Sequence, residues 1–362
     1  MFPNALVVVF CITFALSAGQ DTASQIQTEI QRLQQSLRDK PISDADFRGL
    51  NSMVEGGLKS AADALSAGWV YLSLERLNQA MDLLEGARLA EEKKASAVKG
   101  GLAAYESEWS AASLSLGAIH QETGKRNWND APAAIRALAE TAEARTVPLL
   151  DGGRGFAMAT GPKDGLFYLG EALGQAEFAK LCSAVSSPRN GSPALRRSLL
   201  RELQDLQAKT NAAFVPPRSI DLHPRFIALN STINLARELD AARSYSGTLY
   251  QYLEAVRHYG MLDAPLVDAA RQAVLKTSVD ALLKKLSGSE RDDSIARLFA
   301  ERAASQVSPP GGSAPTADEW RSAQVIIDQV MPAYDAALRK TVPSIRLASK
   351  TVDLTLVRWP YT

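Results

Sequence analysis

The sequence is poor in the residue types that bind metals or form covalent cross-links. It contains two cysteines and three histidines among 362 residues. Cys11 lies in an N-terminal apolar run, which leaves Cys182 without a partner for an intramolecular disulfide. His120, His223 and His258 are far apart in sequence, and none has a second ligand at metal-binding spacing. We therefore expect no metal and no cofactor, and we expect Cys182 to be a buried structural thiol.

The chain also lacks an excess of charge of either sign. Forty Lys and Arg residues balance forty Asp and Glu residues. A surface that binds nucleic acid or an anionic membrane non-specifically needs net positive charge. We therefore expect no nucleic-acid partner. We also find no serine nucleophile motif and no Cys/His pairing, and so we assign no catalytic residue.

Long apolar runs are missing except at the N-terminus. The first twenty residues have no charged side chain, and Ala5–Leu16 is a largely apolar run of twelve residues. That run is shorter than the ~20 residues that a spanning helix needs, and small residues follow it. We predict a signal peptide over 1–19, cleaved near Ala18 or Gly19, with an uncleaved anchor as the alternative. The mature chain is then expected to lack a transmembrane helix and to be exported to the periplasm or the extracellular space.

What the sequence has in abundance favours helix. Ala, Leu, Glu, Arg and Gln dominate, and β-branched runs are scarce. Ile26, Ile30, Leu33 and Leu37 recur at helical spacing, which predicts an amphipathic helix that ends before Pro41. We expect an all-α fold. The tail, 351–362, alternates in polarity and is expected to be short and extended.

Two segments of the chain resemble each other. The segment 47–75 aligns without a gap on 226–254, at an offset of 179 residues (226 minus 47). The aligned pairs include Asn51/Asn230, Gly68/Gly247, Tyr71/Tyr250 and Glu75/Glu254. We interpret this as an internal duplication, with chance similarity of two Ala- and Leu-rich helices as the alternative. It predicts a duplicated helical bundle of two pseudo-symmetric halves, 20–190 and 191–350.

The aligned glycines leave the course of the long helices open. Gly68 could end a helix, but Val70-Tyr71-Leu72 offers no capping side chain for a new one. We therefore expect one continuous helix through Gly68 and another through Gly247, with each glycine allowing a neighbouring helix to approach closely. A later helical pattern, from Ala87 to His120, is expected to break at Gly100-Gly101. Near the C-terminus, Thr316 with Glu319 three residues later predicts the capped start of a helix over 316–340.

The matched polar pairs are the first candidate site. Asn51, Asn230, Glu75 and Glu254 lie within amphipathic helical patterns. They could form hydrogen bonds between helices, or they could face each other across the pseudo-axis as a ligand site. His258 lies four residues after Glu254, so a helix would place both on one face.

The segment 151–165, DGGRGFAMATGPKDG, is the second candidate. We expect it to be an irregular loop, because it contains five glycines and a proline. Its spacing does not match a phosphate-binding P-loop, which requires Lys directly after the second glycine. A ligand or partner site here would use Arg154, Lys163 and Tyr168, whereas the alternative is a plain connecting loop.

Three functional hypotheses follow. The first is an exported, non-enzymatic interaction or binding module, whose protein partner or small ligand the sequence does not identify. The second is a periplasmic protein that binds a metal or small molecule between the two halves. The third is a hydrolase or lyase with its site near 151–165.

Overall fold

A computed structural model describes residues 22–128, 131–185, 197–216 and 219–339. The expected signal peptide, the boundary near 190 between the halves and the C-terminal tail lie outside these residues. Within them the protein is all-helical, as the sequence predicts, and none of these helices is long and apolar enough to cross a membrane. The N-terminal part contains α1 (Thr22–Asp39), α2 (Leu50–Ser66), α3 (Val70–Thr123), α4 (Ala133–Ala159) and α5 (Pro162–Ala184). The C-terminal part begins with α6 (Leu200–Ala213), α7 (His223–Ala241) and α8 (Tyr245–Asp263). It continues with α9 (Ala269–Ser287), α10 (Ser294–Val307), α11 (Ala317–Val325) and α12 (Met331–Arg339).

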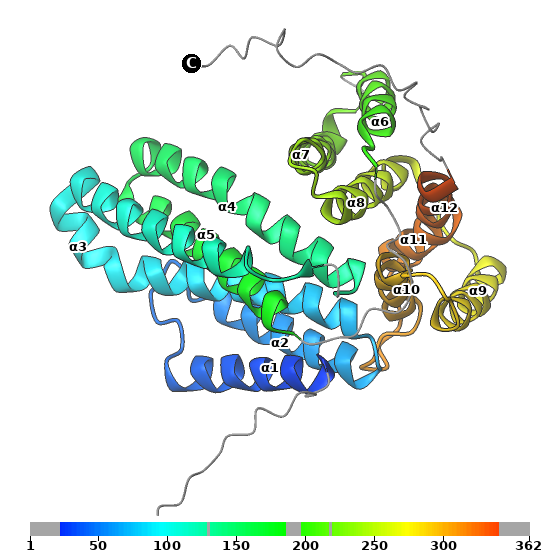
Figure 1. The fold of residues 1–362 in the computed structure, drawn as a ribbon, viewed down its shortest axis with the longest axis horizontal. Coiled ribbons are helices and arrows are strands. Elements are labelled where there is room, and N and C mark those ends of the chain that lie inside the picture. Colours follow the sequence, from blue (N-terminus) through cyan, green and yellow to red (C-terminus); the bar gives the residue numbers. More distant parts are fainter. Residues whose placement is uncertain (1–21, 129–130, 186–196, 217–218, 340–362) are drawn as a thin grey trace, which may run out of the picture.

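Helix α3 folds back on itself at Gly101 (Figure 1). This glycine has φ 60° and ψ −145°, which is not helical. Lys93 Nζ lies 3.3 Å from Glu108 Oε1, although fifteen residues of straight helix would separate them by about 22 Å. The expected break at Gly100-Gly101 is therefore confirmed. Together with α4 and α5, the two segments of α3 form the elongated arm of the molecule (Figure 1).

The expectation of a continuous helix through each aligned glycine is wrong. Helix α2 ends at Ser66, and Gly68 has φ +78°, which favours glycine. The second break falls at Ala242–Ser244, where Arg243 has φ 60°. Gly247 thus lies in the first turn of α8 rather than at a break. A β-carbon on Gly247 would lie 3.1 Å from the Glu140 Cβ, so the expected close approach of a neighbouring helix is confirmed at this glycine.

The expected loop at 151–165 is also wrong. Helix α4 runs through this segment to Ala159, and α5 begins at Pro162, so that only Thr160 and Gly161 connect them. The glycines serve helix packing instead. A β-carbon on Gly165 would lie 2.6 Å from the Gly153 carbonyl oxygen and 2.6 Å from the Ala157 Cβ. Tertiary contact therefore overrides the weak helix propensity of these glycines.

Other local expectations are confirmed. Cys182 is free and buried in α5. Thr316 and Glu319 form a capping box at the start of α11. Between α11 and α12, Ile326–Val330 forms a π-helical turn.

The two parts share one hydrophobic core. A single cluster of buried apolar residues extends from Ile26 in α1 to Ala337 in α12. The two parts also cap each other's helices. Glu301 Oε2 of α10 accepts hydrogen bonds at 3.0 Å from the backbone N–H groups of Tyr71 and Leu72 at the start of α3. Glu140 of α4 accepts one at 2.7 Å from Gly247 N at the start of α8.

Candidate functional site

A cleft of about 780 Å³ lies between the two parts of the molecule. Its lining comes from α3 and α4 on one side and from α7, α8, α10 and α11 on the other. Polar and charged side chains dominate the lining, among them four arginines and four glutamates: Arg76, Arg145, Arg257, Arg302, Glu75, Glu238, Glu254 and Glu319. This is a volume at which protein sites bind small molecules.

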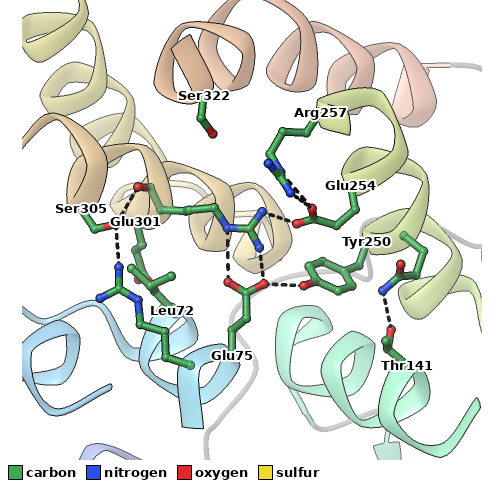
Figure 2. A network of polar contacts seen from close by, with 12 residues as sticks. Leu72, Glu75, Thr141, Tyr250, Glu254, Arg257, Glu301, Ser305 and Ser322 are labelled. Atoms are coloured by element: carbon green, nitrogen blue, oxygen red, sulfur yellow. Dashed lines mark hydrogen bonds and ion pairs between the residues drawn. The ribbon is translucent and has the colours of Figure 1, made fainter. Parts of the chain in front are cut away.

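Arg302 of α10 joins Glu75 and Glu254 in the wall of this cleft. Figure 2 shows these two glutamates, from α3 and α8, extending toward the same region. Its Nη2 bonds Glu75 Oε1 and its Nη1 bonds Glu254 Oε1, while Nε donates to Glu75 Oε2 at 3.3 Å. Tyr250 donates its hydroxyl hydrogen to Glu75. Arg257 Nε donates to Glu254 Oε2 at 2.9 Å. The network therefore contains two guanidinium groups and two carboxylates, so that its formal charges cancel.

The protonation states of this network follow from its burial and its partners. Burial alone would raise the pKa of Glu254, but Arg257 and Arg302 outweigh it and lower that pKa to about 2. Burial would likewise lower the pKa of Arg302, yet Glu254 and Glu75 raise it well above its usual range. Burial, together with the charge of Arg257, lowers the pKa of His258 to about 4. At neutral pH His258 is thus a neutral hydrogen-bonding group that lines the cleft.

Arg145 is the cleft arginine most open to a ligand. It is exposed, and none of the hydrogen bonds or ion pairs found in the described residues involves its side chain. Asp82 and Glu171 lie near enough for the charge of Arg145 to lower their pKa values. Burial raises the pKa of Asp82 to about 8 and that of Glu171 to about 7. Around neutral pH these acids only partly offset the charge of Arg145.

The structure separates the four residues of the first candidate site. Glu75 and Glu254 meet on Arg302, and both line the cleft. The two asparagines lie elsewhere, and each forms a hydrogen bond that joins its helix to a preceding segment of the chain. Asn51 Oδ1 accepts from Ile42 N at 2.9 Å, while Asn230 Oδ1 accepts from Gln207 Nε2 at 2.7 Å.

The three residues of the second candidate site lie on the arm, outside the cleft lining, and have protein partners. Arg154 Nε donates to Glu106 at 2.9 Å. Lys163 forms an ion pair with Asp46 and lies 4.8 Å above the Phe47 ring. Tyr168 stacks on Phe156 with 4.5 Å between ring centroids. These contacts join neighbouring helices and the segment that follows α1.

Sequence reasoning missed the arginines of the cleft. Arg302 and Arg257 occupy ordinary positions in amphipathic helical patterns, and no spacing distinguishes them from solvent-facing arginines. The available signal was indirect. Glu75 and Glu254 interrupt otherwise apolar helix faces, and buried carboxylates require a cationic or hydrogen-bonding partner.

The fold and the cleft define an all-helical protein with one shared core and a polar cleft between its two parts. In the described residues, no group of three or more Asp, Glu, His or Cys side chains is placed to hold a metal ion. Comparison with known protein families, with curated proteins and with solved structures found no match. The functional argument therefore depends on the cleft itself.

Proposed function

We propose that this protein is an exported, non-enzymatic binding protein, and that it binds a small polar molecule with an acidic group in the cleft. The observation that carries the proposal is the cleft lining. Residues from both parts of the chain converge on one cavity of about 780 Å³, and Glu75 and Glu254 lie together in its wall. The apolar N-terminal run supports export.

The acidic group of the ligand is inferred from the cleft arginine whose charge has no strong protein partner. Arg302 is occupied by Glu75 and Glu254, so it belongs to the framework of the cleft rather than to the ligand. Arg145 is exposed and only partly offset by its acidic neighbours. A guanidinium group binds carboxylate or phosphate through paired hydrogen bonds. Gln79 and His258 also line the cleft and supply neutral hydrogen-bonding groups.

Native mass spectrometry of the protein purified from the exported fraction tests this proposal first. We expect an added mass of a few hundred daltons or less on the folded chain. We expect Arg145→Gln to weaken retention of this mass by about tenfold or more, because a hydrogen bond to a charged group contributes about 1.5–3 kcal/mol. Thermal-shift titration with small carboxylates and phosphates then identifies the acidic group.

Arg201→Gln is the matched control, because Arg201 is exposed on α6 and lies outside the cleft lining. It should leave the bound mass unchanged. If Arg145→Gln retained the ligand as well as the wild type, or if neither an added mass nor a thermal shift appeared, the small-molecule proposal would fail. An added mass equal to a protein chain would instead support the interaction-module hypothesis.

We also propose that the chain arose by duplication, and the reciprocal helix caps support this. In α4, Arg136 Nε donates to Glu140 at 2.6 Å, and Glu140 caps α8. In α10, Arg297 Nε donates to Glu301 at 3.0 Å, and Glu301 caps α3. Both pairs are four residues apart and perform the same task for the opposite part of the molecule. A sequenced homologue that contains only one half would test the proposal directly, since that half should assemble as a dimer with the caps exchanged.

A further inference from the structure

A second cavity, of about 590 Å³, adjoins the polar cleft and differs from it in chemistry. We call it the arm groove. It is lined by the returning segment of α3, by α4, by Ala176 of α5 and by the end of α7. The stripe of α4 that lines it includes Glu143, Val147 and Leu150, whereas Arg145 and Pro148 of the same helix line the polar cleft. Helix α4 is thus a wall common to both cavities.

The lining of the arm groove is mainly apolar. Leu116 and Ile119 of α3 face Leu150 of α4 across it, and Leu239 contributes from α7. Val147 is 60% exposed, which is unusual for a large apolar side chain in a concave surface. An apolar cavity of this size favours a hydrocarbon chain or ring over water.

The charged groups of the arm groove are all acidic apart from one histidine. Glu140, Glu143 and Glu238 line it, with His120, and no Lys or Arg belongs to the lining. Glu140 is occupied by Arg136 and Gly247 N. Glu143 accepts a hydrogen bond from the Thr123 hydroxyl, and its Oε1 lies 3.9 Å from His120 Nδ1, so no Lys or Arg of the described residues forms an ion pair with it. Glu238 is exposed at the border with the polar cleft.

From this combination we propose that the arm groove binds an amphipathic organic cation, with its apolar body against the α3–α4 wall and its amine or quaternary ammonium group near Glu143 and Glu238. Charge complementarity selects the occupant. An anionic amphiphile of the same shape would meet Glu143 and Glu238, which form no ion pair with Lys or Arg in the described residues. This site is separate from the one proposed for the polar cleft and does not depend on it.

Isothermal titration of the mature protein with octyltrimethylammonium, octyl glucoside and octyl sulfate, all below their micelle concentrations, tests this proposal. We expect the cation to bind most tightly, the neutral glycoside more weakly and the sulfate least. Within a butyl, hexyl and octyl ammonium series, affinity should rise by up to about fourfold for each methylene that enters the groove. Glu143→Gln and Glu238→Gln should each weaken cation binding by about threefold to tenfold and leave glycoside binding unchanged.

Gly117→Leu tests the location without endangering the fold. Gly117 lines the arm groove, and a β-carbon there meets nothing within 4 Å. The leucine should fill the groove and abolish binding while it maintains or raises the melting temperature, because it replaces a helical glycine. Gly56→Leu is the matched control, since Gly56 is also helical with open space at its β-carbon but lies outside both cavities.

The outcomes are distinct. The arm-groove proposal is supported if cation binding is lost in Gly117→Leu, weakened in Glu143→Gln and retained in Arg145→Gln. This holds whether or not the polar cleft binds a ligand. Equal binding of octyl sulfate, no dependence on chain length, or full binding by Gly117→Leu would overturn the proposal. Markedly tighter cation binding in Arg145→Gln would place the cation in the polar cleft, because this change removes a like charge there, and it would also overturn the proposal.

Discussion

Replacement of Arg302 by methionine should destabilise the protein strongly, because it removes a cationic partner from two buried carboxylates. The side chains of Arg302, Glu75 and Glu254 are 13%, 10% and 9% exposed. After the change Glu254 keeps its hydrogen bond from Arg257, whereas the Tyr250 hydroxyl is the only hydrogen-bond partner left to Glu75 in the part of the chain that the structure describes. Removal of one partner from a buried ion pair costs about 3–5 kcal/mol. We therefore expect Arg302→Met to lower the free energy of unfolding by that amount in urea titrations.

A double-mutant cycle with Glu75→Gln separates this loss from simple loss of packing. Glu75→Gln in the Arg302→Met background removes the stranded charge, so it should restore about 2 kcal/mol or more. Arg201→Met on the exposed face of α6 is the control and should change stability by less than about 0.5 kcal/mol. A loss below about 1 kcal/mol in Arg302→Met, or a double variant no more stable than the single one, would refute the reasoning.

The pH dependence gives an independent check. In the wild type, the pKa of Glu254 is lowered in the folded state, so the stability that this carboxylate contributes is present above its unfolded pKa and is lost as the pH falls toward 2. In Arg302→Met, Glu254 has lost one of the two guanidinium groups that lower its pKa, so less of this stability remains to be lost in acid. The difference in stability between the two proteins should therefore shrink below about pH 5. A difference that stays constant from pH 7 to pH 4 would contradict a charge-based cause.

Two further predictions concern other buried acids. Glu301→Ala should lower the free energy of unfolding by about 2 kcal/mol and speed amide exchange at Tyr71 and Leu72, because their N–H groups lose their acceptor. Glu55→Ala, at an exposed position of α2, is the control. Unchanged exchange at the start of α3 would contradict the cap. Burial raises the pKa of Asp82 to about 8 in the folded state, so wild-type stability should fall as the pH rises from about 4 to about 8. Asp82→Asn should make that decline smaller and unfold at a higher temperature than the wild type at pH 8.5, and an equal or lower melting temperature there would contradict the buried acid.

Local sequence patterns predicted much of the helical framework. The apolar periodicity of α1, the break at Gly101 and the Thr316 cap each depend on residues close together in the chain, and all three are confirmed. Glu75 and Glu254 were also identified, because a carboxylate on an apolar helix face indicates a polar contact whatever the partner. For these features the physical cause lies within a few residues, and the sequence displays it.

The break at Gly68 and the helix at 151–165 depended on contacts between distant segments. No cap for α3 is visible near Val70, because the acceptor is Glu301, 230 residues after Tyr71. The glycines at 153 and 165 indicate a loop in the sequence, yet they allow α4 and α5 to touch.

Likewise, Arg302 became a central residue only when α10 was placed against α3 and α8. The sequence by itself determined most of the helical segments and their apolar faces, because those properties follow from short-range periodicity. The tertiary structure alone decided which distant carboxylates cap helices, which arginine neutralises them and where the cavities lie, because each of these depends on side chains that meet only after the helices pack.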